Sequence, residues 1–215
     1  KELLTTPKAL ASIRKSLFLA VSSATICSVI GTAIVIAVRK SKGFLKKTLE
    51  GISLLPEMLP SIVLVIGLML FWNAIYKVIP LYNTIGIMVL AYVVLYLPYT
   101  VQYVTSAFTQ INESLLEAGR TFGGTPAYVF CRVTLPMISR GIFAGWMMIF
   151  IIAFRELVTA SLIAPPNTLV VSTYINREFE QGSVSLGMAM AVLCVLITTT
   201  ALLVFNRFVG KRKGA

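Results

Sequence analysis

Residues 112–136 read NESLLEAGRTFGGTPAYVFCRVTLP and form a polar interruption in a chain that is apolar on both sides. Ser114 followed three residues later by Glu117 matches a capping box, so a short helix is predicted to begin near Leu115. This helix should end at Gly123-Gly124, because glycine adopts a left-handed C-cap without steric cost. The stretch therefore predicts one short helix that is closed by a glycine turn.

A second short helix is predicted to follow from Pro126. Thr125 can cap this helix, and a proline in the first helical turn lacks only an N–H that would have no intrahelical partner. Leu135-Pro136 should then break it. The two helices would form a compact helix-turn-helix between membrane spans, and its expected role is to present a surface to a partner outside the membrane.

The composition indicates an integral membrane protein. Of 215 residues, 57% are hydrophobic and 13% are charged, which is too apolar for an ordinary soluble domain of this length. The net charge of +11 comes from 19 Lys and Arg against 8 acidic residues. These cations crowd the ends of apolar runs, as expected where they hold loops on the cytoplasmic side, so the charge does not indicate nucleic-acid binding.

We expect an all-α bundle of about five transmembrane helices. The loop at residues 39–47 carries Arg39, Lys40, Lys42, Lys46 and Lys47 and should be cytoplasmic. Alternation from this loop also places residues 112–136 in the cytoplasm. Pro56 and Pro60 should kink or unwind the second span at its entrance. The five predicted spans are residues 17–38, 52–72, 84–104, 141–164 and 186–205.

The N-terminal segment does not fit this alternation, because it is basic and an odd number of spans places it outside. Either it is an interfacial helix whose long side chains reach the membrane surface, or it follows an earlier span that sets its orientation. The second explanation is favoured because the sequence has no initiator Met. We therefore expect residues 1–215 to be a single permease domain within a longer polypeptide. The cations concerned are Lys1, Lys8, Arg14 and Lys15.

Several kinds of chemistry are excluded by residue type. The sequence has no His and no Asp, so it offers neither a Ser-His-Asp triad nor a metal-ligand cluster. It also has no Gly-x4-Gly-Lys-Ser/Thr loop for nucleotide phosphates. Cys27, Cys131 and Cys194 are expected to be packing residues. We predict no catalytic residue and no bound metal or cofactor, so uphill transport would need energy from a partner or an ion gradient.

Arg155 and Glu156 are the candidate pathway residues in the fourth span. Arg155 would lie about 21 Å along a helix that begins at Gly141, at ~1.5 Å per residue. Such charges usually face a bundle interior or a water-filled path. Either the pair forms an interhelical salt bridge, or Arg155 lines the route of an anionic or metal–anion substrate with Thr159 and Ser161 nearby.

Glu57 is a further candidate pathway residue, between the two prolines of the second span. It either stays in the headgroup region near the cytoplasmic face, or a broken helix places its carboxylate beside the pathway.

The polar interruption resembles the signature of permease subunits of binding-protein-dependent ABC importers. That signature reads Glu-Ala-Ala, three residues, Gly, nine residues, then Ile-x-Leu-Pro. Here Glu117-Ala118-Gly119, Gly123 and Val133-Thr134-Leu135-Pro136 have the same spacing. Gly119 replaces Ala and Val133 replaces Ile, and both changes are mild.

The resemblance implies a type I ABC importer permease fold in the bacterial inner membrane. It implies that the loop docks on a cytoplasmic pair of ATP-binding subunits, which bind the ATP, through Glu117, Ala118, Gly119, Gly123, Leu135 and Pro136. Glu117 either caps its own helix or also pairs with a basic residue of that partner. A second permease half, an extracytoplasmic substrate-binding protein and the lipid bilayer are the other implied partners.

The chain looks most like the C-terminal half of fused permeases for ferric iron. Importers of polyamine, thiamine or phosphonate share this architecture, and a secondary transporter or channel without an ATPase is the alternative class. A DNA-reading helix-turn-helix is excluded, since Arg120 and Arg132 are too few cations to neutralise phosphates.

Overall fold

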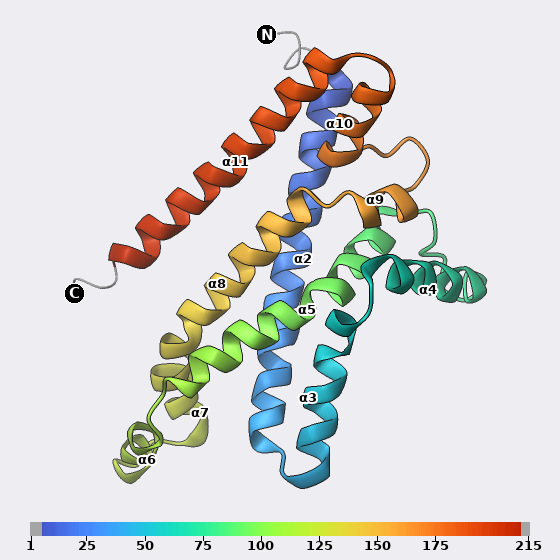
Figure 1. Cartoon of the computed structure of the whole chain (residues 1–215). Coiled ribbons are helices and arrows are strands. Elements are labelled where there is room, and N and C mark those ends of the chain that lie inside the picture. Colours follow the sequence, from blue (N-terminus) through green and yellow to red (C-terminus); the bar gives the residue numbers. More distant parts are fainter. Residues whose placement is uncertain (1–5, 212–215) are drawn as a thin grey trace.

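The computed structural model describes residues 6–211, and these residues fold into helices joined by short connections (Figure 1). Four helical segments are long and apolar enough to cross a membrane, and a fifth crossing is possible if one bent helix pair counts as a span. The helices are α2 (Pro7–Lys40), α3 (Gly43–Met58), α4 (Ser61–Ala74), α5 (Ile85–Thr109), α6 (Glu113–Thr121), α7 (Pro126–Val129), the π-helix η1 (Phe130–Thr134), α8 (Leu135–Phe154), α9 (Val158–Ile163), α10 (Val171–Glu180) and α11 (Val184–Lys211).

Three long helices, α2, α5 and α8, pack against one another and hold the core. Small residues allow the close approach. A Cβ added at Gly141 would lie 2.5 Å from the Cβ of Ala107 and 2.8 Å from the carbonyl oxygen of Tyr103, so only glycine fits where α8 meets α5. A Cβ at Gly31 of α2 would meet the side chain of Thr100 at 2.7 Å. The core therefore depends on backbone contact as well as on apolar side chains.

The first span begins earlier than predicted, because α2 starts at Pro7 rather than at residue 17. Residues 7–16 continue the same helix and are not a separate interfacial helix. Ser12 and Ser16 are buried, and the Ser16 hydroxyl accepts a hydrogen bond of 2.8 Å from the backbone N–H of Val171. Lys1 lies outside the described residues.

The second span is broken where the two prolines were expected to kink or unwind it. The apolar run is divided between α3 and α4, which are bent by 106°. Leu59 is extended, with φ −100° and ψ 141°, as expected for a residue before proline, and Pro60 is the N-cap of the next helix. The break therefore lies at the second of the two prolines, whereas Pro56 is inside α3.

The fourth span was also misplaced at both ends. Helical structure runs from Pro126 to Phe154 without the predicted break at Leu135-Pro136. The π-helical turn before Pro136 is wider than an α-turn, which gives the proline ring room beside the preceding carbonyl groups. At the other end, α8 stops at Phe154, and residues up to 163 form the separate helix α9.

The remaining elements agree with the sequence. Helix α5 covers the predicted third span and extends to Thr109, and α11 covers the fifth. The polar segment before α11 contains the short helix α10. Helix α11 contacts α10 but buries little of its apolar surface in this chain, and Figure 1 shows it diverging from the other helices.

Candidate functional site: the α6–α7 loop and the helix break at residue 155

The helix pair α6–α7 projects from one end of the bundle (Figure 1). Its N-terminal cap is Asn112, whose side-chain oxygen accepts a hydrogen bond of 3.3 Å from the backbone N–H of Ser114. The predicted capping box on Ser114 was therefore wrong. Asn112 is as good an N-cap as Ser114, and its extended backbone places it just before the helix.

The predicted glycine turn is confirmed. Gly123 has φ +81°, in the left-handed region that favours glycine. The Thr125 hydroxyl accepts from the N–H of Tyr128 at 3.3 Å, so Thr125 caps α7 as expected. A Cβ at Gly124 would lie 2.6 Å from the Gly119 carbonyl oxygen, so this glycine is required by close approach. The turn thus fixes α7 against α6.

Most of the surface of this element is uncovered. Glu117, Ala118 and Gly123 are exposed. Phe122 is 91% exposed and Tyr128 is 60% exposed, whereas Val129 is buried and packs beside Gly119. Phe122 and Tyr128 thus give this element an exposed aromatic surface outside the apolar spans.

Phe122 is not among the docking residues predicted from the sequence, and Leu115 marks only the predicted start of the first helix. Both side chains are exposed. Phe122 is the C-cap residue of α6, directly before the left-handed Gly123.

Leu135 and Pro136 lie apart from this exposed tip. They occupy the start of α8, directly after the π turn. Pro136 borders a groove of about 590 Å³ between α5 and α8, together with Tyr103 and Arg140. Their position connects the loop to the span, while Glu117 and Phe122 form its outer surface.

Glu156 is a hydrogen-bonded link at the break between α8 and α9. Its carboxylate accepts 2.6 Å from the Tyr96 hydroxyl of α5 and 3.1 and 3.2 Å from the N–H and hydroxyl of Thr159. Its backbone carbonyl accepts from the hydroxyl of Ser172 in α10. One residue thus joins α5, α9 and α10, which is a positioning role.

Arg155 differs from its neighbour. Its side chain is exposed, and no ion pair joins it to a carboxylate among the side chains that the structure describes. The predicted salt-bridge alternative for the pair is therefore wrong. Because α8 ends at Phe154, Arg155 lies at a helix terminus and not on a continuous helix, as the distance count had assumed.

Ser161 and Glu57 are the other two candidate pathway residues, and both make hydrogen bonds within the described part of the chain. The exposed Ser161 hydroxyl bonds to the carbonyl of Leu157 in its own helix. Glu57 lies about 21 Å along α3 from Gly43, at ~1.5 Å per residue, and beside the break before α4, so it does not remain at the start of that helix. The Gln102 amide of α5 donates to its carboxylate.

Polar residues of α5 form a surface that sequence reasoning missed. Gln102, Ser106 and Thr109 recur at helical spacing on one face, and this period in an apolar helix was a usable signal. They line a groove of about 630 Å³ with Arg39 and Glu50. The groove opens on the half of the bundle that carries the basic loop.

The described residues contain no group of three or more His, Cys, Asp or Glu that could hold a metal ion.

A family model, binding-protein-dependent transport system inner membrane component, matches residues 29–214. The chain belongs to this family. It is thus a permease component of a binding-protein-dependent transport system and a multi-pass membrane protein, and its homologues are transport subunits rather than enzymes.

The permease is similar to curated relatives with several substrates. It is 24% identical over 148 residues to the Fe(3+)-transport system permease protein FbpB 2 of Haemophilus influenzae, covering 69% of this chain and 29% of that protein. It is 27% identical over 184 residues to the putrescine transport system permease protein PotI of Escherichia coli K12, covering 84% and 66%. It thus spans less than two thirds of either relative. The molybdenum permease ModB of Mycobacterium bovis is 26% identical over 209 residues, covering 91% and 79%.

Solved structures show the same fold at low identity. A bacterial alginate ABC transporter, in complex with a periplasmic protein that carries an alginate pentasaccharide, matches with a TM-score of 0.84 at 17% identity, covering 100% of this chain and 82% of that one. The methionine ABC transporter MetNI in an inward-facing conformation matches with a TM-score of 0.77 at 17% identity, covering 94% of each chain. The predicted fold of an ABC importer permease is thereby confirmed.

Proposed function

We propose that this permease forms half of the translocation pathway of an ATP-driven importer and receives the driving motion through α6–α7. The observation that supports this most is the exposed surface around Phe122, which has no counterpart in this chain to cover it. The chain itself has no phosphate-binding loop, so the nucleotide would be bound by a separate pair of ATP-binding subunits. A second permease half and an external substrate-binding protein would complete the assembly.

Charge reversal at Glu117 tests this proposal. Glu117→Lys should weaken association with the ATP-binding subunit roughly tenfold or more, because it places a like charge against the basic residue expected there. Glu50→Lys is the matched control, since it makes the same charge change outside the loop. The measurement is co-purification together with substrate-stimulated ATP hydrolysis. Equal loss in both variants, or in neither, would contradict a docking role.

The class of transporter has its own test. Uptake into vesicles should require internal ATP and persist when ionophores abolish the proton and sodium gradients. Uptake that follows the gradient and ignores ATP would instead support the secondary-transporter alternative.

For the substrate we propose ferric iron, carried with an anion past Arg155. Two observations support this: the similarity to a ferric permease, and an exposed guanidinium with no carboxylate partner in the described part of the chain. An uncompensated cation favours an anionic complex and disfavours a polyamine. Glu57, Thr159 and Ser161 were predicted as further pathway groups. Thr159 is buried and bound to Glu156, whereas Glu57 is exposed, so Glu57 is the stronger second candidate.

Uptake of labelled ferric iron, with putrescine and molybdate as competitors, tests the substrate. Iron uptake should fall in Arg155→Ala and be largely retained in Arg155→Lys, which keeps the charge. Unchanged uptake in both variants would remove Arg155 from the pathway, and transport of putrescine in place of iron would overturn the substrate.

A further inference from the structure

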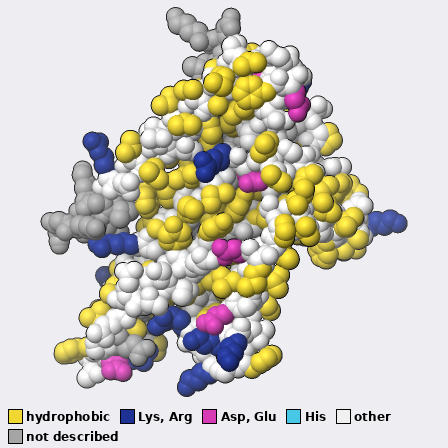
Figure 2. All heavy atoms as spheres, in the orientation of Figure 1, with side chains coloured by type: hydrophobic (Ala, Val, Ile, Leu, Met, Phe, Trp, Pro, Cys, Tyr) yellow, Lys and Arg dark blue, Asp and Glu magenta, His cyan; other side chains and the backbone are white. Residues whose placement is uncertain are grey.

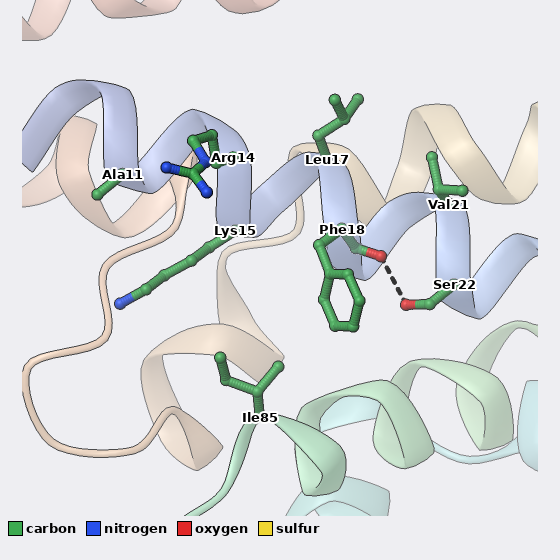
Figure 3. Close-up of a pocket in the computed structure, with 8 residues that line it drawn as sticks. All are labelled: Ala11, Arg14, Lys15, Leu17, Phe18, Val21, Ser22 and Ile85. Carbon is green, nitrogen blue, oxygen red and sulfur yellow. Dashed lines mark hydrogen bonds between the residues drawn. The ribbon is translucent and has the colours of Figure 1, made fainter.

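A groove of about 790 Å³ lies along α2 at the end of the bundle opposite the α6–α7 loop. Arg14 and Lys15 stand at its upper rim, and Leu17, Phe18, Val21 and Ile85 form its apolar walls. Figure 3 shows Lys15 and Phe18 projecting from α2 toward the side on which Ile85 points back from the start of α5. The groove therefore joins a cationic end to an apolar channel.

The two cations lie at the level of lipid headgroups. Residues 17–38 of α2 carry no charge and span about 32 Å at ~1.5 Å per residue, close to the ~30 Å of a bilayer core. Arg39 and Lys40 mark one boundary of this stretch, so Arg14 and Lys15 mark the other. Within residues 6–211 neither Arg14 nor Lys15 pairs with a carboxylate. Both cations belong to the basic N-terminal segment, which did not fit the predicted alternation of loops across the membrane.

Beyond the groove, exposed apolar side chains continue along the same helix. Leu17 is 43% exposed, Phe18 is 58% exposed and, farther along, Val29 is 67% exposed. From Leu17 to Val29 the distance is about 18 Å at ~1.5 Å per residue, comparable with one leaflet of a bilayer. The Ser22 hydroxyl bonds to the Phe18 carbonyl oxygen at 2.6 Å (Figure 3), so it adds no unpaired polar group to this surface.

We propose that this groove binds an anionic glycerophospholipid of the leaflet opposite the coupling loop. Arg14 and Lys15 hold the phosphate-bearing headgroup, and one acyl chain lies along Leu17, Phe18 and Val21. The apolar lining of the groove and the exposed apolar face that follows it lie beneath two cations without a carboxylate partner, and this matches the two chemically different parts of such a lipid. The inference rests on the membrane-spanning fold and is independent of the substrate and of the ATP-binding partner.

A tryptophan in the groove provides the test. Phe18→Trp is placed in the assembled transporter, which is reconstituted with phosphatidylcholine or phosphatidylglycerol brominated on the acyl chains. The parent protein supplies the fluorescence background of Trp72 and Trp146. Quenching of the new tryptophan should favour the brominated phosphatidylglycerol about fivefold for each cation that contacts it.

Charge variants in the Phe18→Trp background decide the outcome. In the double variant Arg14→Gln, Lys15→Gln, the ratio of quenching by phosphatidylglycerol to quenching by phosphatidylcholine should fall close to one. Arg14→Lys should retain the preference for phosphatidylglycerol. Lys77→Gln, which removes a cation from an exposed position outside the groove, is the control and should leave the preference unchanged. Equal quenching by both lipids, or a preference that survives the double substitution, would overturn the proposal. No quenching by either lipid would show that a protein segment covers the groove, which also overturns it.

Discussion

The α6–α7 loop and the break between α8 and α9 both interrupt apolar helices, but Phe122 of the loop and Glu156 of the break lie in opposite environments. In the loop, the side chains of Phe122 and Glu117 are exposed. At the break, Glu156 makes hydrogen bonds that link α5, α9 and α10. An exposed loop is suited to a partner, and a hydrogen-bonded carboxylate is suited to holding helices in place.

Figure 2 shows how apolar and charged side chains are distributed over one face of the molecule. Hydrophobic side chains cover much of the visible face of the bundle, as expected for a surface that meets lipid or another permease half. Lys and Arg gather mainly toward the lower end of that face, where the α6–α7 loop and the connection between α2 and α3 lie in Figure 1. The polar loop is therefore outside the apolar belt, and the break is within it.

The largest expected effect is at the break. Glu156→Ala should lower the free energy of unfolding by about 2–4 kcal/mol, because the buried Tyr96 hydroxyl and the donors of Thr159 lose their acceptor. Arg155→Ala is the matched control and should change it by less than about 0.5 kcal/mol. Denaturation of the purified protein in detergent measures both. Equal losses in the free energy of unfolding for the two variants would contradict the different roles given to Glu156 and Arg155.

The next effect concerns the close contact between α5 and α8. Gly141→Ala should destabilise the bundle by about 1–3 kcal/mol, because its Cβ would lie within 3 Å of both Ala107 and Tyr103. Gly67→Ala is the control, since nothing lies within 4 Å of the added Cβ. The same denaturation assay applies, and a neutral Gly141→Ala would mean that α5 and α8 approach each other less closely than the structure shows.

A smaller effect distinguishes the two possible caps of the loop. Asn112→Ala should destabilise α6 by about 1 kcal/mol, and Ser114→Ala by clearly less, because the Asn112 side chain makes the capping bond. Hydrogen exchange of the α6 amides measures the difference. A larger destabilisation by Ser114→Ala than by Asn112→Ala would instead support the capping box that was predicted from the sequence.

The smallest effect on stability is at the exposed tip. Phe122→Ala should change the free energy of unfolding by less than about 0.5 kcal/mol, yet reduce stimulation of the ATP-binding partner strongly, because the side chain has few contacts within this chain. Phe44→Ala removes a similarly exposed ring outside the loop and should preserve the stimulation. A large stability loss in Phe122→Ala would mean that the ring is structural after all.

The sequence predicted well those features that depend on local chemistry. Apolar runs indicated membrane-spanning helices, Gly123 indicated the left-handed turn, and Thr125 indicated the cap of α7. The loop was recognised from its spacing before its shape was known. Such features need only neighbouring residues, so a single sequence contains them.

Features that depend on tertiary packing were predicted poorly. Pro60 and Pro136 look alike in sequence, yet the chain bends by 106° at the first and continues through a π turn at the second. The end of α8 at Phe154 likewise has no local stop signal. Glu156 bonds to Tyr96, sixty positions earlier in the chain, so its role could be seen only when α5 and α9 were brought together.

Photocrosslinking from position 122 tests the central claim most directly. A benzoylphenylalanine replaces Phe122 in the assembled transporter, and a second variant carries it at Phe44, which is 85% exposed at the start of α3. The account predicts a covalent adduct with the ATP-binding subunit from position 122 and none from position 44. No adduct from position 122, or equal adducts from both positions, would contradict the claim that the α6–α7 loop is where the ATP-binding partner docks.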